Sequence, residues 1–115
     1  MARIRIRRVY EPPADDDGFR VLVDGLWPRG LSKERAGVDL WLREIAPSAG
    51  LRRWFGHDPK RWKEFVRRYR QELRENPEPV KRLRTMAREK AVTLLFAAKD
   101  EAHNNAVALQ QYLDR

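Results

Sequence analysis

Two polar segments of the chain hold the residue types that bind anions or move protons. One reads Asp24-Gly-Leu-Trp-Pro-Arg-Gly30 and the other reads Lys99-Asp-Glu-Ala-His-Asn-Asn105, and each follows an apolar run. A carboxylate and an imidazole can exchange protons with a ligand, so Asp24 and His103 are the candidate catalytic residues. Arginine and lysine bind oxyanions, and an indole can stack on a base or a sugar. The candidate ligand-binding residues are Trp27, Arg29, Lys99, Asp100, Asn104 and Asn105.

The same side chains also have local structural interpretations. Asp24 could cap a turn with Arg29 as its partner, and Asp100 could cap the helix that follows it. His103 is expected in the first turn of that helix, where the helix dipole favours a neutral imidazole. The two asparagines after it suit either capping or ligand contact. The residue types alone leave the structural and the functional interpretations open.

Composition limits the other kinds of site that the chain could hold. It has no cysteine and two histidines, so we predict neither a disulfide nor a metal site. His57 lies in an expected loop, where it could be exposed or could face a pocket. The first residues carry no apolar signal core, and the run 91–98 is too short to cross a bilayer. We expect a cytoplasmic protein without membrane contact.

The net charge of +8 lies in one part of the chain. Residues 52–90 hold 14 basic and 6 acidic residues, whereas the rest of the chain is balanced with 11 of each. Such an excess attracts polyanions or keeps a helical surface in solution. The candidate nucleic-acid contacts are Lys60, Lys63, Arg67, Arg70 and Arg74.

The elements that must position these residues can be predicted from hydrophobic patterning. Ile4 and Ile6 alternate with arginines, which indicates a strand at a sheet edge. Continuous apolar runs predict buried strands at 19–24 and 91–98. The link 11–18 is too short for a helical crossover and favours a hairpin or an irregular connection. Helices are expected at 39–46, 59–75, 77–90 and 100–115.

Helices separate the two buried strands, so these strands should be parallel and joined by a right-handed crossover. The 115 residues suffice for one hydrophobic core. We therefore predict a single α/β domain over residues 1–115, with a small, mostly parallel sheet of three or more strands packed with amphipathic helices. The carboxyl ends of parallel strands are where ligands collect in such sheets, so the two polar segments should flank one concavity.

Several motifs of the chain resemble a known family. They are the runs Arg20-Val-Leu-Val-Asp-Gly-Leu-Trp-Pro-Arg-Gly-Leu-Ser-Lys-Glu34, Ile45-Ala-Pro-Ser48, Trp54-Phe-Gly-His-Asp-Pro59 and Leu94-Leu-Phe-Ala-Ala-Lys-Asp-Glu-Ala-His-Asn-Asn-Ala106. Together they are similar to the short, YeaO-like branch of the domain-of-unknown-function family 488. The resemblance implies a prokaryotic cytoplasmic protein and supplies no reaction.

The sequence departs from the family pattern at two places. The short branch usually carries arginine after the strand-end aspartate, whereas this chain has Gly25, so one anion-contacting side chain is missing. Longer relatives carry a Cys-His-Arg cluster where this chain reads Asn104-Asn105-Ala106, so the resemblance implies no cysteine chemistry here.

Two functional hypotheses follow from these observations. The first is a protein that binds, with or without turnover, a phosphorylated or nucleotide-like anion at the strand-end segments. The second is a module that binds nucleic acid without sequence preference through its basic helices. We favour the first, because the most unusual residues gather at the strand ends.

Overall fold

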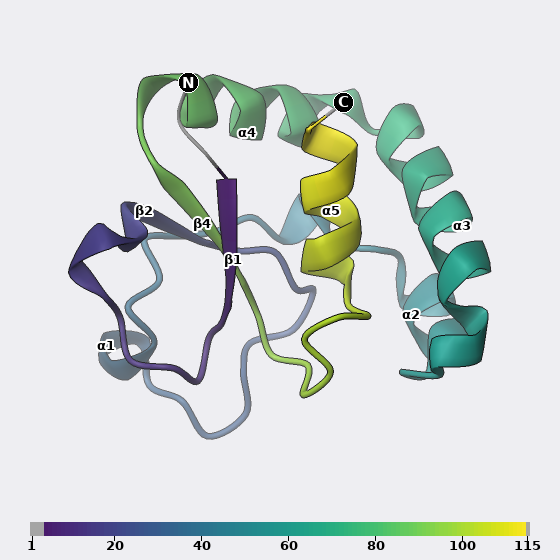
Figure 1. Ribbon diagram of the computed structural model, residues 1–115, viewed down its shortest axis with the longest axis horizontal. Coiled ribbons are helices and arrows are strands. Elements are labelled where there is room, and N and C mark those ends of the chain that lie inside the picture. The colour runs from purple at the N-terminus through teal and green to yellow at the C-terminus, as the bar shows by residue number, and fades with distance from the viewer. Residues whose placement is uncertain (1–3, 115) are drawn as a thin grey trace.

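The computed structural model describes residues 4–114, and its centre is a sheet of four parallel strands (Figure 1). The strands are β1 (Ile4–Arg8), β2 (Phe19–Leu22), β3 (Leu40–Trp41) and β4 (Val92–Phe96), in the order β1-β4-β2-β3. Strand β4 lies between β1 and β2, with Val21 opposite Leu94. The predicted α/β class and the parallel pairing of the two apolar strands are confirmed.

The helices of the described chain differ in length and position. They are α1 (Lys33–Ala36), α2 (Ala49–Phe55), α3 (Trp62–Glu75), α4 (Pro77–Glu89) and α5 (Asn105–Leu113), and three short 3₁₀ turns are η1 (Asp15–Asp17), η2 (Arg43–Ile45) and η3 (Pro59–Arg61). The predicted helices in tandem correspond to α3 and α4, and Asp58 caps η3 as its sequence indicates. Among the helices of residues 4–114, none combines the length and the apolar character that a membrane span requires.

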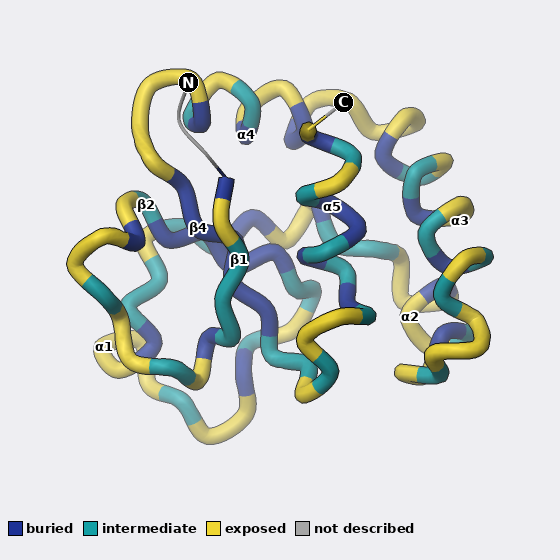
Figure 2. The backbone as a smooth tube through the Cα atoms, viewed as in Figure 1, coloured by how far each residue is buried: buried dark blue, intermediate teal, exposed yellow. Residues whose placement is uncertain are grey.

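One face of the sheet carries the main hydrophobic core. Val21 and Leu94 on the strands pack with Phe65 and Tyr69 of α3 and with apolar residues of α2, α4 and α5. Figure 2 shows this arrangement, with buried strands in the centre and exposed backbone on the outer sides of α3 and α4. The apolar stripe of α3 predicted from its spacing is therefore its core-facing side.

The opposite face of the sheet is covered by α1 and the loops next to it. Leu22 and Leu95 form a second buried cluster there with Val9 and Ala36. Trp27 and Trp41 pack against this cluster with their ring centroids 5.4 Å apart. Alternate residues of one strand thus supply both clusters, which explains why β2 and β4 are buried on both faces, with Arg20 and Thr93 as their only polar residues.

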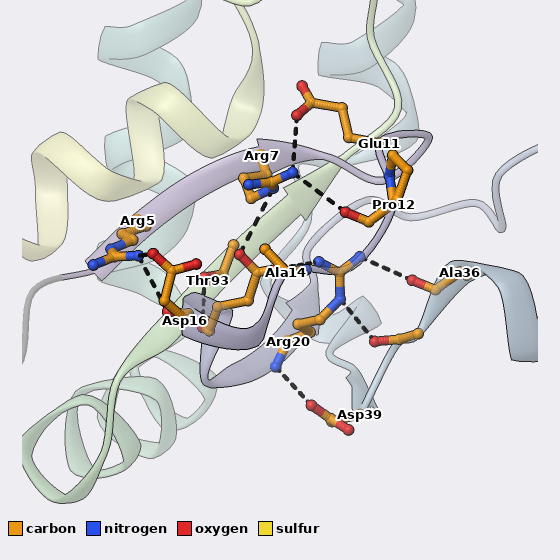
Figure 3. A network of polar contacts seen from close by, with 12 residues as sticks. Arg5, Arg7, Glu11, Pro12, Ala14, Asp16, Arg20, Ala36, Asp39 and Thr93 are labelled. Carbon is orange, nitrogen blue, oxygen red and sulfur yellow. Dashed lines mark hydrogen bonds and ion pairs between the residues drawn. The ribbon is translucent and has the colours of Figure 1, made fainter.

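A buried polar network fills the remaining part of that face (Figure 3). Arg20 forms an ion pair with Asp17 and also donates hydrogen bonds to the carbonyl oxygens of Ala36 and Gly37 at 2.9 Å. Thr93 Oγ1 donates to the carbonyl oxygen of Asp17 at 2.6 Å. The consecutive aspartates of the first link therefore complement arginines that the strands direct to this face.

Two expectations about the elements are corrected by the structure, and a third is decided between its alternatives. The link 11–18 is the irregular connection and not the hairpin, because β4 separates β1 from β2 and the link contains η1. The helix expected at 39–46 is instead β3 followed by η2. The last helix begins at Asn105 and not at Asp100, because Asn104 accepts a hydrogen bond from Val107 N at 3.0 Å and caps it there.

Candidate anion-binding cavity at the strand ends

A cavity of about 790 Å³ opens at the carboxyl ends of β2 and β4. The loop after β2 and the loop after β4 form two of its sides, and α2 with the residues that follow it forms a third. The predicted site residues in its lining are Asp24, Trp27, Arg29, Lys99, Asp100, Asn104 and Asn105. The structure therefore brings both polar segments to one concavity, whereas their roles in binding stay predictions.

Asp24 is fixed at the inner side of this cavity by the neighbouring strand. Its Oδ2 accepts a hydrogen bond from Ala97 N at 2.9 Å, and its carbonyl oxygen accepts one from Trp41 Nε1 at 2.8 Å. Burial raises the pKa of the Asp24 carboxyl above its usual range, and the hydrogen bonds from Ala97 and Asn105 oppose the rise. The carboxylate is thus held in place and partly withdrawn from water.

Three basic side chains from three different segments surround the cavity. Arg29 follows β2, Lys99 follows β4, and Arg52 comes from α2. Within residues 4–114, none of these side chains makes an ion pair or a side-chain hydrogen bond. All three are exposed, so their charged groups remain available to an oxyanion. The sequence interpretation of Arg29 as the partner of Asp24 is not what the structure shows.

The segment after β4 folds around the Asp100 side chain. Its Oδ1 accepts hydrogen bonds from the backbone N–H groups of Ala102 and His103, and its Oδ2 lies 2.9 Å from His103 Nδ1. The bond from His103 holds the pKa of the Asp100 carboxyl below its usual range. Asp100 therefore orders the turn before α5, as well as lining the cavity.

His103 differs from its prediction in two ways. It precedes α5 instead of lying in the first turn of that helix, and it is not among the residues that line the cavity. Its ring packs edge-on against Trp62, with centroids 5.3 Å apart. The physical reason is the Asp100 turn, which holds the imidazole on the side of α3. The structure therefore does not place His103 with Asp24 in the cavity lining.

The asparagines and Trp27 combine structural contacts with positions on the cavity wall. Asn105 Nδ2 donates to the carbonyl oxygen of Val23 at 3.0 Å, whereas Asn104 caps α5. Trp27 Nε1 donates to the carbonyl oxygen of Leu31 at 2.7 Å, which fixes the indole against its own loop. The polar atoms of these three residues are thus partly committed to the fold.

Several lining residues are not predicted by the sequence. Arg52 and Phe55 come from α2, whose short pattern does not indicate a helix, and Pro47 precedes it. His57, for which the sequence left an exposed position and a pocket open, is exposed and also lines the cavity, with a φ of 57° that places it in the left-handed region. Tyr10 reaches the rim from beyond β1, and its hydroxyl donates to the carbonyl oxygen of Arg29 at 2.8 Å. The polar runs after β2 and β4 do not indicate that these distant segments also line the cavity.

The candidate nucleic-acid contacts on η3 and α3, here called the α3 stripe, differ in whether they have internal partners. They are Lys60, Lys63, Arg67, Arg70 and Arg74. Arg67 donates to Glu64 at 2.7 and 2.8 Å, and Arg74 donates to Gln71 at 2.8 Å, whereas Arg70 is half-buried. The two arginines beside Glu64 hold the pKa of that carboxyl down at about 2. Lys60 and Lys63 are exposed and make no side-chain ion pair within the described residues. No cluster of three or more metal-ligating side chains occurs in residues 4–114.

Comparison with known proteins places the chain in a family. A family model described as the inactive DUF488-N3 subclade matches residues 3–115. The chain belongs to this DUF488-N3i family. The resemblance found in its motifs is thereby confirmed.

Relatives of this DUF488-N3i chain cover almost its whole length. The uncharacterized protein Rv3073c of Mycobacterium tuberculosis is 40% identical over 112 residues, which are 97% of this chain and 94% of that protein. The uncharacterized protein YeaO of Escherichia coli is 39% identical over 110 residues, 96% of each chain. No solved structure shows a significant match.

Gly25, which follows Asp24, lies close to a basic side chain of α2. A Cβ atom at Gly25 would lie 3.8 Å from Arg52 Nη1 and 3.6 Å from Ala46 Cβ. The Arg52 guanidinium therefore lies beside residue 25, next to Asp24. In this DUF488-N3i chain a cation is present at that place although residue 25 carries none.

Proposed function

We propose that the strand-end cavity binds a small phosphorylated or nucleotide-like anion and does not transform it. Arg29, Arg52 and Lys99 contact the oxyanion, and Asp24 accepts a hydrogen bond from a hydroxyl or amine of the ligand. Apolar side chains, among them Pro47 and Phe55, support the body of the ligand. The cavity volume of about 790 Å³ is within the range of small-molecule sites.

One observation carries this proposal. Three basic side chains without internal partners among the described residues converge from separate segments on a cavity that also contains a half-buried carboxylate. Arginines that serve the fold have internal acceptors, as Arg20 has in Asp17 and Arg8 has in the carbonyl oxygens of Ala97 and Ala98. Unpaired cations around a concave surface are instead suited to a ligand that brings the negative charge.

Two observations support binding rather than turnover. His103, the candidate proton-transfer residue, points toward Trp62 and is absent from the cavity lining. The description of the family model as an inactive subclade agrees with a site that has lost, or never had, catalysis. Asp24 is anchored to Ala97, and among the described residues no hydrogen bond joins it to His57, the imidazole in the cavity lining, as general acid–base catalysis would require.

Nucleic-acid binding by the α3 stripe alone has less support. Arg67 and Arg74 are engaged by side chains of their own helix, and Arg70 is half-buried. Internal ion pairs must be broken or shared before such arginines contact a phosphate. The stripe therefore offers fewer independent phosphate contacts than its sequence indicates.

The direct test is a binding screen on the intact chain. Thermal unfolding is followed with nucleoside monophosphates and sugar phosphates, each paired with its unphosphorylated counterpart, and hits are quantified by calorimetric titration. A ligand at about 100 times its dissociation constant should add about 2.7 kcal/mol of stability. We expect the phosphorylated member of a pair to stabilise the protein and the unphosphorylated member to have little effect.

Matched variants locate the bound anion. Arg29→Gln and Arg52→Gln should each weaken binding, whereas Arg82→Gln removes an equal charge on α4, at the opposite end of the molecule in Figure 1, and should not. Absence of any phosphate-dependent stabilisation, or equal losses in all three variants, would overturn the proposal.

A further inference from the structure

We infer that the ligand of the cavity is the terminal nucleotide of a single-stranded nucleic acid, with the adjoining phosphates bound along the amino-terminal end of α3. This inference rests on the proposed function, because it names the class of molecule to which the bound phosphate belongs. It also assigns a role to the basic residues that the cavity itself does not use.

The first turn of α3 lies directly beside the cavity. The ring of Trp62 packs on Phe55, which lines the cavity, with centroids 6.0 Å apart. On its other side Trp62 contacts His103, the residue before Asn104 of the cavity wall. In Figure 1 the amino-terminal end of α3 and the β4–α5 connection both lie in the lower half of the molecule. A molecule that leaves the cavity toward α2 therefore meets this end of the helix.

Two of the basic residues at this end of α3 have no internal partner within residues 4–114, whereas Arg61 pairs with Asp58. Lys60 and Lys63 flank Trp62, are exposed, and make no side-chain hydrogen bond or ion pair within residues 4–114. One turn further along, Arg67 and Arg68 share the carboxylate of Glu64. Unpaired basic side chains thus occur in the cavity lining, at Arg52, and in the first residues of η3 and α3.

The depth of the charged groups sets the orientation of a bound nucleotide. Phe55 and Phe65, which form the inner wall, are 4% and 2% exposed, and Asp24 is half-buried, whereas Arg29, Arg52 and Lys99 are exposed. The base and sugar therefore face inward, where Asp24 accepts from an amine or a hydroxyl. The phosphate lies at the opening, so its second ester bond can lead out of the cavity to the next nucleotide. This is the arrangement of a 3′-terminal nucleotide, whose 5′-phosphate is a diester, so the 3′ end of the strand enters the cavity.

Recognition of this kind depends on the end of the nucleic-acid chain and on charge more than on base sequence. The lysines contact phosphates, which are the same in every sequence, and only the terminal base enters the cavity. Each phosphate contact on single-stranded nucleic acid contributes about 0.7 to the slope of log affinity against log salt. The affinity for a single-stranded nucleic acid should accordingly depend more steeply on salt concentration than the affinity for a mononucleotide.

The experiment compares three probes by competition and fluorescence anisotropy. They are deoxyadenosine 5′-monophosphate, a linear 5′-phosphorylated deoxyadenylate 20-mer, and the same 20-mer closed into a circle. We expect the linear strand to bind about tenfold or more tighter than the mononucleotide, because linked contacts raise the effective concentration. The circle, which has no end to enter the cavity, should bind about tenfold more weakly than the linear strand.

Variants separate the cavity from the helix. The double variant Lys60→Gln/Lys63→Gln should reduce the affinity for the linear strand to that for the mononucleotide and leave the mononucleotide affinity unchanged. The matched control Arg82→Gln/Arg88→Gln, on exposed positions of α4, should change neither. Arg29→Gln should lower the affinity for both the linear 20-mer and the mononucleotide.

The possible outcomes distinguish failure of this inference from failure of the proposed function. Equal affinity for the mononucleotide and the linear strand overturns this inference and leaves the proposed function standing. Equal affinity for the linear and circular strands also overturns it, because the basic surface then acts without the cavity. Binding of none of the three probes would count against the proposed function itself.

Discussion

Asp24 Oδ2 accepts a hydrogen bond from Ala97 N at 2.9 Å, so the loop that follows β2 is fastened to the loop that follows β4. The two loops come from adjacent parallel strands, and this bond sets their relative position at the cavity. Asp24 therefore serves the fold and the candidate site with different oxygen atoms. A variant at this position therefore requires measurements of both the free energy of unfolding and ligand binding.

Asp24→Asn should stabilise the free protein at neutral pH. The pKa of the Asp24 carboxyl is raised in the folded state by burial, so its charged form lowers stability as the pH rises above the unfolded value of 3.8. Asparagine keeps an oxygen acceptor for Ala97 N and carries no charge. Urea unfolding of both proteins at several pH values should show an advantage of the variant at pH 7 that disappears below pH 3.8. A variant less stable than the parent at pH 7 would contradict this expectation.

His103→Ala should leave ligand binding unchanged. Its imidazole faces Trp62 and lies outside the cavity lining, so no contact with a bound phosphate is lost. Titration of the variant with whichever phosphorylated ligand the screen identifies should return the parental dissociation constant, whereas Arg52→Gln raises it. A loss of affinity in His103→Ala equal to that in Arg52→Gln would require the imidazole to turn into the cavity.

Arg20→Met should be among the most damaging single substitutions in the described chain. Arg20 and Asp17 have side chains 5% and 1% exposed, so the substitution leaves a buried carboxylate without its main partner. Breaking a buried ion pair in this way costs about 3 to 5 kcal/mol. The matched control is Arg5→Met, which removes the exposed pair with Asp16 and should cost less than about 1 kcal/mol. Denaturant titration of both variants measures the difference.

Two glycine substitutions should have opposite effects on stability. Gly18 has a φ of 68°, and a Cβ there would lie 2.8 Å from Ala91 Cβ, so Gly18→Ala strains the backbone and forces β2 from β4. Gly50 lies within α2, and a Cβ added there would meet no atom within 4 Å. Gly50→Ala should therefore raise stability by about 0.5 to 1 kcal/mol, as alanine does in a helix. Thermal unfolding midpoints should move down for the first variant and up for the second.

The elements that the sequence predicts well are those whose pattern is long and uniform. Trp62, Phe65, Tyr69 and Leu73 repeat at helical spacing along α3, and β4 is buried at every position. Strand β3 has two residues. Trp41 and Ile45 are four residues apart, which is the spacing of a helical stripe, although they lie in β3 and η2. Helix α2 escapes prediction because its seven residues make less than two full turns and include a glycine, although Leu51, Trp54 and Phe55 have helical spacing.

The candidate site divides in the same way. Asp24, Arg29 and Lys99 can be placed together from sequence, because the ends of adjacent parallel strands meet at one edge of a sheet. Arg52 and His57 reach the cavity through the packing of α2, which no local pattern encodes. The position of His103 depends on where α5 begins, and the sequence offers Asp100 and Asn104 as competing caps.

Strand β4 is the last strand of the described chain, yet it occupies the position between β1 and β2. During synthesis, β1 and β2 precede β4, and they do not pair with each other. Before residues 92–96 are made, β2 can pair with β3, but its side towards β4 has no partner. The parallel arrangement that creates the cavity thus makes completion of the sheet depend on the last of the four strands in sequence.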